Sequence, residues 1–155
     1  MRHIVNILGM VAFQVGLLFV ALLLASPTFG TPIFQDLLSP QEWETWSGTF
    51  LLSADTTIAV AFAFCLIWYV TAQLFFKVDR WEKSNKRTVW ATLAAVVLFV
   101  CLVAGYFSAQ VPGDFMLVYL FFVVVFLFGF WAATICFSPS SHKYAPLLAQ
   151  AVRRW

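Results

Sequence analysis

Long runs of apolar residues alternate with short polar segments along this 155-residue chain. Four of the runs reach about 20 residues, the length at which a helix crosses about 30 Å of hydrocarbon. They cover approximately residues 4–25, 56–76, 89–108 and 115–137. The runs are continuous, without the in–out alternation of a barrel strand. The pattern therefore predicts four transmembrane helices in a single polytopic domain over residues 1–155.

Composition agrees with a membrane location. Hydrophobic residues make up 63% of the chain and charged residues 10%, whereas soluble domains average about 45–50% and about 25%. A soluble domain of this size has too little interior to bury so much apolar surface. We therefore expect an all-α integral membrane protein, folded as a bundle of four transmembrane helices.

Four spans place the connecting segments alternately on the two sides of the membrane, and the charged residues are distributed unequally between these sides. All nine lysine and arginine residues fall on one side, and the opposite side carries only acids. Positive segments resist translocation, so we expect the basic side to be the cytoplasmic side of a bacterial inner membrane, with both termini inside. The basic residues that could contact a partner or lipid there are Lys77, Arg80, Lys83, Lys86, Arg87, Arg153 and Arg154.

The segment between the first two spans predicts a further short helix outside the membrane. Ser39 stands as N-cap, Pro40 at the first helical position and Glu42 three residues after the cap, which is a capping-box arrangement. The two tryptophans that follow favour the lipid–water boundary. We expect residues 40–52 to form an interfacial helix that lies on the outer face of the membrane.

Asp55, followed by two threonines, stands at the expected outer mouth of the second span. A carboxylate there could draw a cation into a pore, but residues of this type also cap helix N-termini, and we favour the cap. No ionisable side chain is expected deep within a span. Ion-coupled transporters and proton relays generally need such groups, so these classes are disfavoured.

Two segments are expected on the cytoplasmic side. Residues 77–88 form a short basic loop, and the tail 138–155 begins with a polar run. An apolar stripe after Pro146 predicts a short helix over residues 146–155 that ends in basic residues. These segments are the parts of the chain that a soluble partner would meet.

Small residues four positions apart occur on all four spans and favour close helix packing in lipid. The pattern fits contacts within one chain and contacts between copies equally well, so we expect a homo-oligomer or a larger complex. The pairs are Ala12–Gly16, Ala59–Ala63, Ala91–Ala95, Cys101–Gly105 and Gly129–Ala133. Phenylalanines surround the whole circumference of the fourth span, which we expect to face lipid on most sides or another chain.

Candidate chemistry is sparse. The three cysteines lie in apolar runs without a CxxC pair, which disfavours a disulfide framework, a thiol metal site and the four-helix thiol oxidases. The two histidines lie near the cytoplasmic edge and are poor candidates for haem ligands. No Gly-rich phosphate loop or hydrolase motif occurs. We expect no enzymatic activity, cofactor or metal.

Polar side chains within the spans are uncharged. Small multidrug transporters rely on a carboxylate in the first of their four helices, where this chain has Gln14. We expect Gln14 to bond across to another helix, and the alternative is a polar cavity lined by several such residues. The set is Gln14, Thr71, Gln73, Thr92 and Thr134.

Three functions remain open. The first, which we favour, is a non-catalytic membrane subunit that self-associates and presents its basic face to anionic lipid or an acidic cytosolic protein. An anchor, sensor or scaffold of this kind would suit a bacterial secretion, respiratory or anti-phage complex, and nucleic acid is not expected as a partner. The second is an oligomeric channel or pore. The third is an assembly or immunity factor that binds another membrane protein laterally.

Overall fold

The computed structural model describes residues 2–28, 39–74, 83–109 and 116–137. Within these residues the chain is helical without strands, and four helical segments are long and apolar enough to span a membrane. The predicted all-α architecture with four candidate spans is confirmed. The segments are α1 (Arg2–Ala25), α3 (Pro40–Leu74), α4 (Lys83–Ser108) and a fourth composed of α5 (Met116–Val124), η1 (Val125–Ala132) and α6 (Ala133–Phe137).

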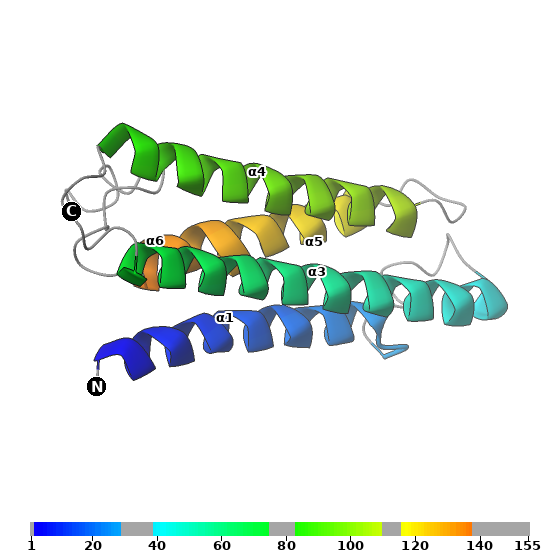
Figure 1. Ribbon diagram of the computed structural model, residues 1–155. Helices are drawn as coiled ribbons and strands as arrows, with labels where there is room; N and C mark the ends of the chain where they lie inside the picture. The colour runs from blue at the N-terminus through cyan, green and yellow to red at the C-terminus, as the bar shows by residue number, and fades with distance from the viewer. Residues whose placement is uncertain (1, 29–38, 75–82, 110–115, 138–155) are drawn as a thin grey trace.

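The second span differs from the prediction, because α3 runs without a break over Pro40–Leu74. The separate interfacial helix expected over residues 40–52 and the helix start expected at Asp55 are both wrong. No proline interrupts this segment, and the Thr56 hydroxyl donates to the Leu52 carbonyl at 2.7 Å, within the preceding turn. At 35 residues, α3 is about 52 Å long and extends past the neighbouring helix ends in Figure 1.

The start of α3 is as the sequence predicts. The Ser39 backbone N–H donates to Oε2 of Glu42 at 2.8 Å, and the Ser39 hydroxyl donates to the same oxygen at 2.6 Å. In return, the Glu42 backbone N–H donates to Ser39 Oγ at 3.4 Å. This capping box satisfies donors that the first turn of a helix leaves unpaired.

The third span, α4, begins at Lys83, six residues before the expected start at residue 89. Lysine and arginine are good helix formers in water, so the last part of the expected loop 77–88 extends the helix instead. Residues 77–82 lie outside the described residues. So does the tail 138–155, with the helix expected over residues 146–155.

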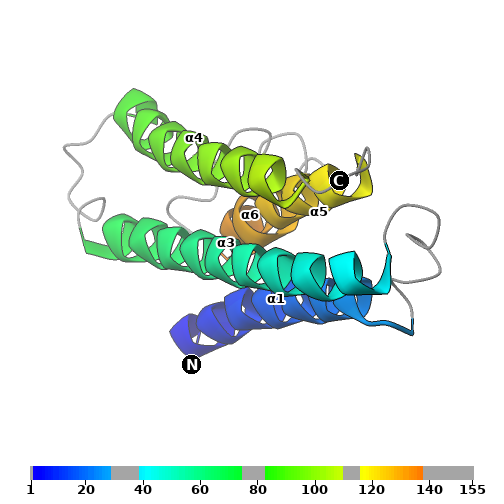
Figure 2. The same ribbon diagram turned by 90° about the vertical axis from the view of Figure 1, so that its right-hand side faces the viewer.

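The helices form an antiparallel bundle with α3 and the fourth segment at its centre. Each of α1 and α4 packs against both central helices, on opposite sides of that pair (Figure 1, Figure 2). We call the end with His3, Gln73 and Arg87 the basic end, and the end with Glu42 and Ser108 the acidic end.

Aromatic rings fill the bundle toward the acidic end. Trp46 and Phe50 stack with ring centroids 5.1 Å apart, and Phe50 meets Phe121 and Phe122 edge-on at 5.3 and 6.1 Å. The fourth segment is the most buried of the four, with Phe121, Phe122 and Phe130 in the core. The other helices of the same chain cover these three phenylalanines, whereas Phe128 is 50% exposed, so the fourth segment has one face in the core and one face open to lipid or another chain.

The small-residue pairs divide between the interior and the surface. Cys101–Gly105 and Gly129–Ala133 lie in the interior, where a Cβ on Gly105 would come within 3.1 Å of the Tyr119 ring. The pairs on exposed faces are Ala12–Gly16, Ala59–Ala63 and Ala91–Ala95. These outward pairs are available for contacts with other chains.

Candidate functional site

Three helices meet at the backbone carbonyl of Gly129, deep in the bundle. Nε2 of Gln14, on α1, donates to this oxygen at 2.7 Å, and the thiol of Cys65, on α3, donates to it at 3.1 Å. Both side chains are buried. The expected bond from Gln14 to another helix is therefore present. We call Gln14, Cys65 and Gly129 the polar node.

A side chain at position 129 would crowd the polar node. A Cβ there would lie 3.0 Å from Cδ1 of Leu17 and 3.2 Å from Oε1 of Gln14. Gly129 belongs to η1, a π-helical segment. Such segments are rare in proteins, and those that occur are often found at functional sites. Oε1 of Gln14 is buried and has no hydrogen-bond partner among the described residues. The node is thus closely packed around an amide with one unbonded oxygen.

A second polar contact joins α4 to the fourth segment, nearer the basic end. The indole Nε1–H of Trp90 donates to Oγ1 of Thr134 at 3.0 Å, and this hydroxyl donates to the Trp131 carbonyl at 2.9 Å. Hydrogen bonds between membrane helices contribute about 0.6 kcal/mol on average, and up to about 1.7 kcal/mol. Together with the polar node, this contact links all four segments in one register.

The other predicted polar residues do not join these interior contacts. Gln73 and Thr71 are half-buried toward the basic end of α3. Thr92 is exposed on α4, where its hydroxyl donates to the Thr88 carbonyl at 3.0 Å. Gln14 and Thr134, the other two residues of the predicted set, are buried in the core. The set therefore does not line a single path through the described part of the bundle.

At the basic end, α1 and α3 share a polar contact that the sequence did not single out. Nδ1 of His3 lies 2.7 Å from the Tyr69 hydroxyl and 3.3 Å from Nε2 of Gln73. The His3 and Tyr69 rings meet edge-on, with centroids 6.2 Å apart. This contact fixes the N-terminal turn of α1 against the last turns of α3.

The basic residues expected to face a partner are only partly described. Lys83 is the first residue of α4, and Lys86 and Arg87 follow in its first two turns. Arg87 is exposed and Lys86 half-buried. Both lie at the same end of the bundle as His3. The expected contact residues that fall outside the described ranges are Lys77, Arg80, Arg153 and Arg154.

Asp55 takes a place that the sequence did not predict. The candidate span runs over Pro40–Gln73, which at 34 residues is longer than a membrane crossing needs, and it includes this carboxylate together with Glu42 and Glu44. The side chain is exposed on the outer surface of α3, on the same face as Leu52 and Ala59. It neither caps a helix nor takes part in the interior contacts.

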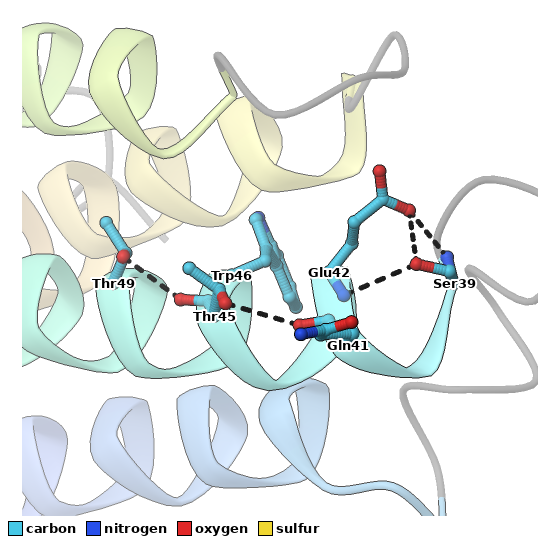
Figure 3. A pocket seen from close by; sticks show the side chains of 6 residues that line it. All are labelled: Ser39, Gln41, Glu42, Thr45, Trp46 and Thr49. Atoms are coloured by element: carbon cyan, nitrogen blue, oxygen red, sulfur yellow. Dashed lines mark hydrogen bonds between the residues drawn. The ribbon is translucent and has the colours of Figure 1, made fainter.

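A shallow depression at the acidic end of α3 gathers several polar side chains (Figure 3). The Thr45 hydroxyl donates to the Gln41 carbonyl at 3.2 Å, and the Thr49 hydroxyl to the Thr45 carbonyl at 3.1 Å. Glu42 is held by the capping box with Ser39. These bonds serve the helix itself, so the depression does not define a binding site.

Neither a metal site nor a similarity to known proteins assigns a chemical function to the described residues. Among the described residues, no three His, Cys, Asp or Glu side chains lie close enough together to hold a metal ion. Comparisons with protein-family models, curated proteins and solved structures gave no match to this chain.

Proposed function

We propose that the chain is a non-catalytic subunit of a bacterial inner-membrane complex, acting as an anchor, sensor or scaffold. It crosses the membrane four times with both termini in the cytoplasm, associates laterally with other chains, and presents its basic end to an acidic soluble protein. One observation carries this proposal. All nine lysine and arginine residues belong to one side of the four spans.

The interior of the bundle supports a structural role. Its polar side chains bond between helices, at the polar node and at the contact of Trp90 with Thr134. Buried networks of this kind favour one packing of the helices over others. The outward small-residue pairs support lateral association, since small residues let helix backbones approach closely in lipid.

The start of α4 supports docking at the basic end. Lys83, Lys86 and Arg87 precede the apolar part of the helix, so they stand next to the membrane surface. A basic residue in that position gains about 1 kcal/mol from anionic lipid, and an acidic protein surface offers the same kind of attraction. Three basic residues within the first five positions of α4 therefore concentrate positive charge at this end of the chain.

Orientation is tested by labelling single added cysteines on intact cells with an impermeant maleimide. A cysteine replacing Gln41 should be labelled from outside, whereas one replacing Ser84 or Ser140 should be labelled only after the inner membrane is permeabilised. The reason is the exclusion of positive segments from translocation. Labelling of the Ser84 position on intact cells would reverse the topology and remove the basis of the proposal.

Docking is tested by replacing Lys83, Lys86 and Arg87 together with glutamine. Insertion should stay normal, because the remaining basic residues still mark the inside. Recovery of the cytosolic partner with the tagged protein from native membranes should fall by about tenfold, equivalent to about 1.4 kcal/mol. Raising the salt concentration should mimic the loss for the parent chain, since exposed charges are screened over about 10 Å at 0.1 M.

The matched control keeps the charge and changes only the side chains, with Lys83→Arg, Lys86→Arg and Arg87→Lys in one chain. It should recover the partner as well as the parent does. Equal recovery by the glutamine variant at low salt would show that the basic end serves only to orient the chain, and the docking role would be withdrawn.

A further inference from the structure

The helix α3 is longer than one crossing of the membrane needs. It is about 52 Å long, whereas the hydrocarbon core of a bilayer is about 30 Å thick. Tilting by about 20°, the average for transmembrane helices, would shorten its reach by only about 3 Å. The neighbours α1 and α4, at 24 and 26 residues, are about 36 and 39 Å long. Part of α3, about 20 Å in all, therefore has to lie outside the hydrocarbon.

The end of α1 identifies one level along α3. Leu17 of α1 and Ala61 of α3 both lie at Gly129, 3.0 and 3.5 Å from the position that a Cβ there would take. From this point toward the acidic end, α1 stops at Ala25 over the distance that brings α3 to residue 53. Asp55, an exposed carboxylate, is thus about level with the end of α1. The rest of α3 on the basic side, residues 56–74, carries no charged residue and is about 28 Å long, which matches the hydrocarbon thickness.

Two exposed tyrosines identify a second level, on the other side of the bundle. Tyr106 lies on α4, and Tyr119 of the fourth segment lies beside Gly105 of the same helix. Gly105 and Tyr106 are within one turn of Ser108, whose carbonyl accepts a hydrogen bond from Trp46. The two tyrosines are therefore about level with Trp46 on α3. Tyrosine is enriched at the membrane–water interface, where its ring contacts acyl chains and its hydroxyl contacts water.

The first turns of α3 offer no apolar surface to lipid. Between Pro40 and Thr49, no large apolar side chain is among the exposed ones. Trp46 and Phe50 are buried, because Trp46 bonds to α4 and Phe50 packs on the fourth segment. A helix that lies on a membrane surface keeps its apolar face toward the lipid. Here that face is turned into the bundle, and the segment continues the direction of α3 (Figure 1). Its exposed residues are Pro40, Gln41, Glu42, Glu44, Thr45, Gly48 and Thr49.

We infer that the hydrocarbon ends between the level of Asp55 and that of Tyr106, and that the first turns of α3 stand upright in the water beyond it. The two levels are about 10 Å apart along α3. Tyr106 and Tyr119 lie among the lipid headgroups, whereas Gln41 and Glu44 face water. This placement goes beyond the proposed function, because it holds whichever end of the bundle faces the cytoplasm. It adds a polar helical face at the acidic end that only water-soluble molecules can meet.

The test places single spin labels along one side of α3 in liposomes of phosphatidylcholine and phosphatidylglycerol. The labelled variants are Gln41→Cys, Leu52→Cys and Ala63→Cys, at exposed positions about three turns apart, and Cys136→Ser removes the exposed native thiol. Oxygen collides with a label most often in hydrocarbon. A neutral nickel chelate does so in water, because transfer of polar groups to hydrocarbon is unfavourable. The ratio of nickel to oxygen collision rates should be at least about tenfold higher at position 41 than at position 63, with position 52 between them. The labelled chains should unfold at the temperature of the parent, since the three positions are exposed.

Two results would overturn the inference. A ratio at position 41 equal to that at position 52 would lay the first turns of α3 in the headgroup layer. A ratio at position 41 as low as that at position 63 would place the whole helix in hydrocarbon. Maleimide labelling of the Ser84 position on intact cells is a separate result. It would reverse the proposed topology and leave the collision ratios unchanged, because the nickel chelate is supplied on both sides of the liposome membrane.

Discussion

Gly129→Leu is expected to lower the unfolding temperature of the detergent-solubilised protein by about 5 °C or more. The new side chain would start from a Cβ only 3.0 Å from Leu17 and 3.2 Å from Oε1 of Gln14. Overpacking of this kind costs about 1–3 kcal/mol, and occasionally more. The change also forces apart the helices that donate to the Gly129 carbonyl. Thermal unfolding followed by size-exclusion chromatography measures the effect.

Gly48→Leu is the matched control for this substitution. Gly48 lies in the exposed part of α3, where nothing is within 4 Å of an added Cβ. The same exchange there should leave the unfolding temperature unchanged or raise it slightly, because leucine favours helix over glycine by up to about 1 kcal/mol. Equal stability of the two variants would contradict the close packing described at the polar node.

Trp46→Ala is the second substitution with a large expected effect. Trp46 is 1% exposed, stacks on Phe50, and donates its Nε1–H to the Ser108 carbonyl at 3.1 Å. That carbonyl lies in the last turn of α4, where no helical donor remains. Removing a buried tryptophan costs about 3–5 kcal/mol, so the unfolding temperature should fall by about 10 °C in the same assay.

Trp46→Phe separates the two contributions of this side chain. A phenylalanine keeps one ring on Phe50 and loses the N–H donor and part of the buried ring, so the loss of stability should be at least about 1 kcal/mol and smaller than that of Trp46→Ala. A Trp46→Ala variant as stable as the parent would show that the acidic end of α3 does not pack against α4.

The number of spans was predictable because hydropathy alone separates the apolar runs from the polar segments. The length of α3 was not. The change from polar to apolar residues near Asp55 predicts a helix boundary, but a change in polarity does not itself end a helix, and no proline follows Pro40 before Leu74. The capping box at Ser39 was the better signal for the start.

The polar node was only half predictable. Gln14 had to bond to something, since an unpaired amide is unfavourable in an apolar interior. Its partner could not be read from the sequence, because the Gly129 carbonyl becomes an acceptor only through the packing of three helices. The donors Cys65 and Trp90 lie in apolar runs, whose pattern predicts only packing for them. Their S–H and N–H groups, placed where no water reaches, were the available signal.

The continuity of α3 has a mechanical consequence. A helix without a joint moves as a rod, and hydrogen bonds hold this rod to its neighbours at three levels: Trp46 to Ser108, Cys65 to Gly129, and Tyr69 with His3. The first and last of these levels are about 34 Å apart along the helix. A sideways force applied at Glu42 would therefore be shared by α4, the fourth segment and α1 instead of bending α3 alone.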